Sequence, residues 1–298
     1  MTVIEHPAVT ITAPATNTTA VAPTVPRSAV APRVLRPAGA PSGLTTVGAV
    51  AARTLKQFVR TPQLIVVGAL TSVMFLLIFR YVFGGAIATG PVAYVDFLIP
   101  GLAAAGAMFS GAGGAVGVAT DAESGLFDRL RSLPIPRSAV LIGRSVADTA
   151  LVGWAVFVTV VVGYLTGYRF HGSAVDAALA VVLCLVYGSA FTWPFIHMGL
   201  VGGNAQAAQG LSMLIFPFVI VSSAYVPVES MPGWMQPIAE HQPVTYMVNS
   251  VRALSLGDEA GAVFTHHAGW YAVRALLWSA AIVAVFLPPA LRRFNARS

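Results

Sequence analysis

Long apolar runs dominate the chain and predict helices that cross a membrane. Six such segments lie at about 64–83, 97–119, 146–168, 174–201, 207–226 and 271–291. Each has about 20 residues or more, the length that a helix needs to cross roughly 30 Å of hydrocarbon. The pattern therefore predicts an all-α integral membrane fold with six transmembrane helices.

Two segments before the first apolar run have a different character. Residues 1–43 combine many prolines with Ala, Thr, Val and Ser, which is typical of a disordered tail. Residues 45–61 alternate with helical spacing, so that Val47, Val50 and Phe58 share one face while Arg53 and Lys56 share the other. This amphipathic pattern predicts an interfacial helix. We therefore expect a disordered cytoplasmic tail over 1–43 and a transmembrane domain over 44–298.

The distribution of basic residues predicts the orientation. With six spans and both termini in the cytoplasm, the inner side holds Arg27, Arg33, Arg36, Arg53, Lys56, Arg60, Arg129, Arg131, Arg137, Arg144, Arg292, Arg293 and Arg297. The outer side or outer edge then holds Arg80, Arg169, Arg252 and Arg274. This excess of inner positive charge favours cytoplasmic N- and C-termini.

Small residues recur at helical spacing in the second apolar segment. The most regular positions are Gly106, Ser110, Gly114 and Gly117. Small side chains let two helices approach closely. The spacing fits packing within the chain as well as a subunit contact or a substrate path. In the fifth segment Pro217 predicts a kink.

The loop between the second and third apolar segments, residues 121–144, predicts a short amphipathic helix. Its apolar stripe consists of Leu126, Phe127, Leu130 and Leu133, while Glu123, Asp128 and Arg131 point elsewhere. Pro134 and Pro136 end the pattern. The stripe could lie on the membrane surface or in a groove of a partner protein.

The external connection before the last span also carries helical spacing. Val244, Met247, Val248 and Val251 form a stripe that we expect to lie in the outer membrane interface, with Trp234 as an aromatic anchor. Short external helices are therefore predicted here.

Composition supports the membrane class and excludes several functions. Hydrophobic residues make up 56% of the chain and charged residues 9%, against about 25% charged residues in soluble proteins. The net charge of +6 has a membrane explanation, so nucleic acid is not an expected partner. A single cysteine, Cys184, excludes an intramolecular disulfide. A phosphate-binding loop needs a lysine after glycine, but Leu55 precedes the only lysine, Lys56. The chain therefore holds no nucleotide site, and we expect no cofactor or metal in it.

Three stretches resemble the permease subunit of ABC-type-2 exporters, most closely the daunorubicin-resistance group of actinobacteria. They are the loop 121–144, YVDFLIPG at 94–101 and the segment 225–254 that begins YVPVESMPGW. The resemblance implies that the loop is a coupling helix contacting a separate ABC ATPase subunit. The matching positions, together with the apolar stripe, are Glu123, Gly125, Leu126, Phe127, Asp128, Arg129, Leu130, Arg131, Ser132, Leu133, Pro134 and Arg137.

That resemblance implies a multi-pass protein of the cell membrane that exports a hydrophobic or amphiphilic compound such as a drug, an antibiotic or a lipid. ATP and Mg²⁺ would bind in the partner ATPase. A second permease chain, identical or different, is expected because six helices are few to enclose a path for a large molecule.

Two alternatives remain open from the residues alone. A proton-coupled secondary transporter needs titratable groups deep in the bundle, whereas Asp96, Asp148 and Asp176 are predicted near span ends. An intramembrane lipid-modifying enzyme would use Glu240, His241, His266 or His267, but neither an HExxH nor a GxSxG motif supports it.

Overall fold

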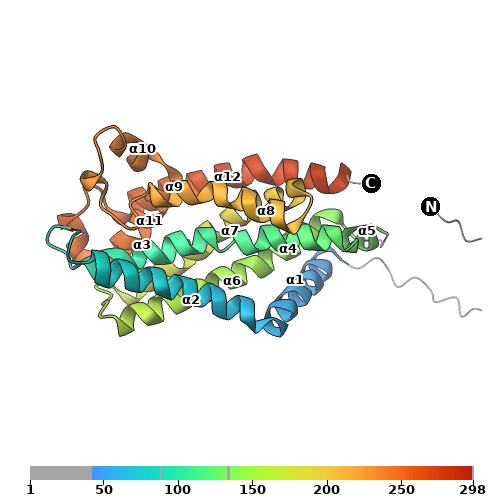
Figure 1. Cartoon of the computed structure of the whole chain (residues 1–298). Coiled ribbons are helices and arrows are strands. Elements are labelled where there is room, and N and C mark those ends of the chain that lie inside the picture. The colour runs from blue at the N-terminus through green and yellow to red at the C-terminus, as the bar shows by residue number, and fades with distance from the viewer. Residues whose placement is uncertain (1–41, 88, 133–134, 297–298) are drawn as a thin grey trace, which may run out of the picture. The chain divides into compact units, whose positions relative to one another are not determined.

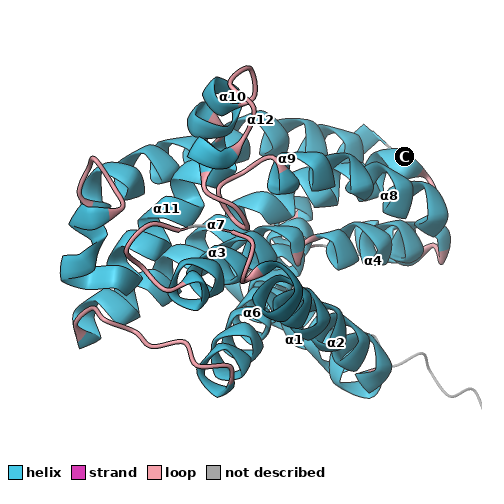
Figure 2. Ribbon diagram, turned by 60° about the vertical axis from the view of Figure 1, so that its left-hand side comes forward, coloured by secondary structure: helices cyan, strands magenta, loops and turns pink. Residues whose placement is uncertain are grey.

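The computed structural model of the chain describes residues 42–87, 89–132 and 135–296, and these residues form helices joined by loops (Figure 1). In Figure 2 all of the regular structure drawn in colour is helical. The all-α prediction is therefore confirmed for the described part of the chain. The predicted tail over 1–43 lies outside the described residues except for its last two positions.

Among the described residues, five stretches of helix are long and apolar enough to cross a membrane. The first, Val66–Phe83, runs through α2 (Pro62–Leu77) and the π-helix η1 (Ile78–Phe83). The second, Tyr94–Glu123, joins α3 (Tyr94–Phe109) and α4 (Ala112–Glu123). The others are α6 (Arg137–Leu165), α7 (Ala174–Gly202) and α12 (Ala268–Ala296). They account for five of the six predicted spans.

The remaining predicted span, at 207–226, is an interrupted helix. It consists of α8 (Ala205–Ser212), the 3-10 helix η2 (Met213–Ile215) and α9 (Phe216–Ile220). Pro217 lies in the first turn of α9, where its missing N–H is tolerated and the α-helical ladder is broken. At about 1.5 Å per residue, Ala205–Ile220 is shorter than the hydrocarbon thickness.

After α9 the chain continues in non-helical form through the protein interior. Ser222, Ser223, Ala224 and Tyr225 are all buried. Lipid cannot hydrogen-bond to irregular backbone, so such a stretch needs partners in the protein. Arg252 provides one, because its Nη2 donates to the Ser223 carbonyl oxygen at 2.8 Å. The polar side of α11 (Pro243–Leu256) therefore stabilises the segment that follows the interrupted span.

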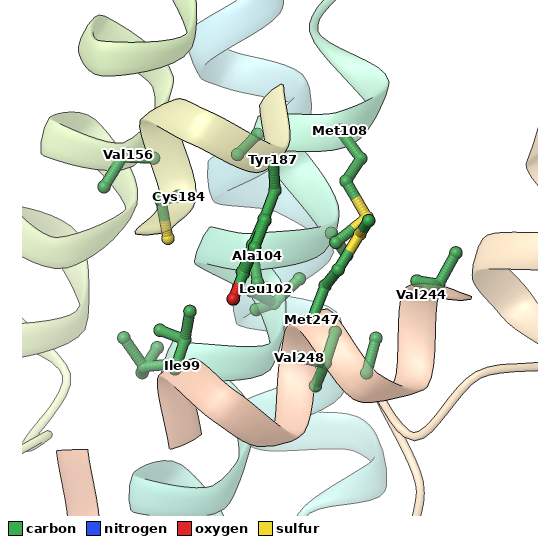
Figure 3. Close-up of a cluster of buried hydrophobic side chains, with 14 of the residues drawn as sticks. Ile99, Leu102, Ala104, Met108, Val156, Cys184, Tyr187, Val244, Met247 and Val248 are labelled. Carbon is green, nitrogen blue, oxygen red and sulfur yellow. The ribbon is translucent and has the colours of Figure 1, made fainter. Parts of the chain in front are cut away.

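Helix α11 lies within the hydrophobic core, which corrects the prediction of an interfacial position. The side chains of its predicted stripe are between 0% and 4% exposed. Figure 3 shows Met247 and Val248 of α11 among core residues of α3 and α7, and the Met108 and Met247 side chains point toward one another. An apolar stripe predicts burial of one face, but it does not tell whether lipid or protein covers that face.

The short elements gather at opposite ends of the helical bundle (Figure 1). At one end lie η3 (Val228–Ser230), α10 (Gln236–His241) and η4 (Gly257–Ala262) with α11, which confirms short helices before the last span. At the other end lies α5 (Leu126–Arg131). The first helix, α1 (Gly43–Arg60), packs against α6 so closely that a Cβ on Gly143 would lie 2.8 Å from the Val47 carbonyl oxygen.

Candidate functional site

Helix α5 is the short amphipathic helix predicted between the second and third spans. It follows directly on α4, and Gly125 between the two helices has a φ of 67°. Residues other than glycine seldom adopt this left-handed conformation. Gly125 therefore allows the chain to turn at the end of α4 and to start a new helix.

The apolar stripe of α5 packs on the chain's own last helix. Phe127 is only 6% exposed, and its ring meets that of Phe294 of α12 edge-on at 5.1 Å between centroids. Leu130 is half-buried against the same cluster, which also contains Val140 and Leu141 of α6. Phe127 and Leu130 therefore face the chain's own helices, and neither the membrane surface nor a partner groove, the two positions that the sequence left open.

The polar side of α5 remains on the surface. Asp128 and Arg129 of α5 are exposed, as are Glu123 at the end of α4 and Arg137 at the start of α6, and Leu126 is half-buried. The side chain of Arg131 and residues Leu133 and Pro134 lie outside what the structure describes. A protein that approaches this end of the bundle would thus contact the charged side of α5, because the apolar side packs against α12 and α6.

Four charged residues beside this helix join α1, α4 and α6. Asp121, in the last turn of α4, lies 3.2 Å from Arg53 of α1 and 3.5 Å from Arg144 of α6. Arg144 also donates from Nε to both carboxylate oxygens of Asp148 at 3.1 Å. Arg144, Asp121 and Asp148 are all buried, with Asp148 only 2% exposed. We call Arg53, Asp121, Arg144 and Asp148 the charged cluster; it joins α1, α4 and α6 beside α5.

Two of the four predicted small residues make room for the charged cluster. A Cβ on Gly114 would lie 2.6 Å from Asp148 Oδ2, and one on Gly117 would lie 2.3 Å from Arg144 Nη2. Gly106, in contrast, has open space where a Cβ would be, and Ser110 donates to the Ala107 carbonyl oxygen. The stripe is therefore not one functional unit, because only its half nearer α5 faces the charges of another helix.

The sequence reasoning missed the charged cluster. It placed Asp148 near a span end, whereas α6 begins at Arg137 and carries Asp148 about three turns further on. The signal was present, since Arg144 and Asp148 are opposite charges four residues apart in an apolar segment. Such a spacing brings two side chains together on a helix, and charges inside a membrane helix favour a function.

The other chemical candidates do not converge. His266 stacks on Trp270 at 3.9 Å between ring centroids, and His241 Nδ1 lies 2.9 Å from the Pro237 carbonyl oxygen. Within residues 42–87, 89–132 and 135–296, no three His, Cys, Asp or Glu side chains are grouped to hold a metal ion. Neither histidine has a nucleophile beside it in these contacts.

A helical membrane bundle with a charged surface helix at one end, beside ion pairs that join α1, α4 and α6, fits a membrane protein of the transporter class. Residues 45–256 match the family described as "ABC-2 type transporter". A daunorubicin resistance ABC transporter permease protein of Streptomyces coeruleorubidus is 31% identical over 248 residues, covering 83% of this chain and 84% of that protein. The chain therefore belongs to the ABC-2 type transporter family.

Two further relatives are described as permeases as well. One is a "Probable doxorubicin resistance ABC transporter permease protein" of Mycobacterium tuberculosis, 25% identical over 75% of this chain and 79% of its own length. The other is a "Probable multidrug ABC transporter permease" of Escherichia coli, 25% identical over 47% of this chain and 38% of its own length. These similarities confirm the predicted permease class, in which ATP hydrolysis belongs to another subunit.

Proposed function

We propose that this chain is the permease subunit of an ATP-driven exporter that moves a hydrophobic or amphiphilic compound, such as a drug, an antibiotic or a lipid, out of the cell. Membership of the ABC-2 family and the similarity to permeases described for daunorubicin and doxorubicin resistance support this proposal. The chain itself holds no cofactor, and ATP and Mg²⁺ bind in a separate ABC ATPase subunit.

The observation that carries the proposal is the arrangement of α5. Its apolar side is held by Phe294 of α12, its charged side is exposed, and the helix before it carries Asp121 of the charged cluster. An ATPase that binds Glu123, Asp128, Arg129 and Arg137 would push on a helix that cannot move without moving α4, α6 or α12. Interfaces and packed cores convert such small shifts into movements of whole helices.

The orientation and assembly follow from the same proposal. The α5 end, where α1 begins and α12 ends, faces the cytoplasm, the N- and C-termini are cytoplasmic, and the α10 end faces outward. Val67, Leu70 and Met74 of α2 are 53% to 61% exposed. This surface is available to membrane lipid and to a second permease chain, identical or different.

Co-purification with a candidate ABC ATPase from the same organism tests the proposal. Arg129→Glu reverses one exposed charge on α5 and should reduce both the bound ATPase and ATP-dependent uptake into inside-out vesicles severalfold, because charge complementarity steers such contacts. Arg60→Glu, an equal change at the exposed end of α1, should leave both unchanged. Transport that proceeds without any ATPase would contradict the proposal.

The position of Asp148 bears on the secondary-transporter alternative. Asp148 is buried inside α6, as a proton site would have to be, and this differs from its predicted place near a span end. Its ion pair with Arg144 at 3.1 Å gives it a structural role instead. If a proton gradient alone drove uptake, and an uncoupler abolished it at constant ATP, the alternative would replace the exporter proposal.

A further inference from the structure

The four arginines that the sequence places at the outer side differ in their hydrogen-bond partners. Arg252 donates to four carbonyl or amide oxygens. Arg169 donates to two carbonyl oxygens, and Arg274 donates to a tyrosine hydroxyl. Arg80, in contrast, forms no ion pair within the described parts of the chain, and its buried Nε has no hydrogen-bond partner there.

Arg80 lies in the π-helix η1, near the last residue of the first span. Leu76, one turn earlier, is only 1% exposed, and this spacing brings the root of Arg80 toward the same side of the helix. The ring of Phe79 stacks on that of Tyr225 at 4.7 Å between centroids. Arg80 as a whole is nevertheless half-buried. Its guanidinium therefore lies at the boundary between the protein core and the membrane, in a type of helix that is rare and frequent at functional sites.

A guanidinium at the end of a membrane span needs an acceptor for its hydrogen bonds. It keeps its charge in proteins and offers five N–H donors. Charged side chains within spans pair with other groups or extend to the lipid headgroups. Because no described residue accepts a hydrogen bond from the buried Nε of Arg80, we look for its partner outside the chain. At the ends of a span, the headgroup region of the bilayer supplies phosphate groups.

An apolar stripe on α2 and η1 leads from the middle of the span toward Arg80. Its members recur every three or four residues and are 38% to 68% exposed; they are Leu70, Met74, Leu77 and Tyr81. The guanidinium carbon of Arg80 lies 5.7 Å from the centroid of the Tyr81 ring. Tyrosine is enriched where the bilayer meets water. The stripe thus offers apolar surface for an acyl chain, and Arg80 offers a cation at the headgroup end.

We propose that Arg80 binds the phosphate group of a phospholipid whose acyl chain lies along this stripe. The lipid belongs to the leaflet at the α10 end, toward which α2 and η1 run (Figure 1). A guanidinium matches two phosphate oxygens at once, which makes arginine well suited to this anion. The inference goes beyond the proposed export function and does not depend on the exported compound.

A second copy of the chain would be a poorer partner for this surface. Arg80 is the only charged residue between Arg60 and Asp96. A twofold contact places the same surface patch of both copies together. Such a contact through α2 and η1 would therefore offer Arg80 no carboxylate, whereas a phospholipid brings its own negative charge.

Lipid binding by the full-length permease in detergent tests the proposal. Phosphatidylglycerol is added in steps, and native mass spectrometry counts the lipids bound to each protein. We expect Arg80→Gln to weaken the tightest binding about fivefold, because one arginine at a lipid surface contributes a factor of this order. Arg169→Gln removes the same charge from an arginine that already donates to carbonyl oxygens, and it should bind like the wild type.

A lipid without phosphate identifies the group that Arg80 recognises. Diacylglycerol with the same acyl chains should bind equally to the wild type and to Arg80→Gln, because only the phosphate is missing. Arg80→Lys keeps the charge but loses the planar fork, so its affinity for phosphatidylglycerol should lie between those of the other two proteins.

Unfolding temperatures separate a lipid site from a structural role of Arg80. Since its Nε bonds to no described residue, Arg80→Gln should unfold at the wild-type temperature in lipid-free detergent. Phosphatidylglycerol should then raise the unfolding temperature of the wild type more than that of Arg80→Gln, because a ligand stabilises the protein that binds it better.

Three results would overturn the proposal. The first is equal affinity of Arg80→Gln and the wild type for phosphatidylglycerol. The second is displacement of the lipid by inorganic phosphate, which would assign Arg80 to a soluble anion. The third is loss of a dimer mass in Arg80→Gln with an unchanged number of bound lipids, which would assign Arg80 to a second copy. The ATPase co-purification described above tests the export function separately, so either proposal can fail alone.

Discussion

Arg144→Met replaces the guanidinium between two buried carboxylates by an apolar side chain of similar length. Asp121 keeps Arg53 as a partner at 3.2 Å, but Asp148, 2% exposed, has Arg144 as its only ion-pair partner among the described residues. Removing one member of a buried ion pair leaves an uncompensated charge and costs about 3–5 kcal/mol. We therefore expect a large loss of stability from this single change.

Thermal unfolding of the purified protein in detergent measures the loss. A cost of this size lowers the unfolding temperature by on the order of 10 °C in a chain of this length. The double variant Arg144→Met/Asp148→Leu removes both charges and should recover most of the stability, because apolar replacements of a buried pair are often neutral. Arg144→Lys keeps the charge but loses the planar fork, so an intermediate value is expected.

The comparison between the single and the double variant decides whether the reasoning is right. If the unfolding temperature of Arg144→Met lies within about 2 °C of the wild-type value, the ion pair contributes little to stability. If the double variant is less stable than the single variant, the buried charge of Asp148 is not the cause of the loss. Either result would refute the structural role assigned to the charged cluster.

Three further predictions follow from the packing. Gly117→Ala should lower the free energy of unfolding by about 1–3 kcal/mol, because the added Cβ would displace the Arg144 guanidinium. Gly113→Ala, in open space on the same helix, should be neutral or slightly stabilising. The unfolding temperatures of the two variants measure the difference. Phe127→Ala should release α5 from α12 and lower the free energy of unfolding by about 3 kcal/mol. We expect faster proteolysis within residues 121–137 and lower ATP-dependent transport. Unchanged cleavage would show that the Phe127 ring does not hold α5 in place. Arg252→Met should lower the free energy of unfolding by at least about 3 kcal/mol, because it leaves the Phe97 and Ser223 carbonyls without their donor. The yield of folded protein should fall accordingly. Arg274→Met, at an exposed position, should reduce that yield less.

The guanidinium of Arg252 stays charged in its buried position. Arg252→Met therefore removes a buried ion and not a neutral group. Burial lowers the pKa of Arg252 to about 9, which is still above neutral pH. The protonated guanidinium donates from Nε, Nη1 and Nη2 to four carbonyl or amide oxygens. The interrupted span and α3 are thus held by one charged side chain of α11.

The sequence by itself determined the membrane class and the short helix between the second and third spans. A run of about 20 apolar residues has few stable structures other than a helix that spans the membrane. Lipid offers no hydrogen-bond partner to backbone groups outside regular structure. The stripe of Leu126, Phe127 and Leu130 likewise predicted α5 with an apolar and a charged side. These properties are local, since they depend on the order of residues within one segment.

Only the tertiary structure decided what covers each face. Helix α11 was predicted at the membrane interface and lies in the core, the stripe of α5 packs on α12, and Gly114 and Gly117 adjoin the charges of α6. Asp121 and Arg144 are far apart in the sequence, and no periodic pattern within one segment reports a contact with another. The physical reason is that periodicity specifies which side of a helix avoids water, whereas lipid, a neighbouring helix and an ion pair all satisfy that requirement.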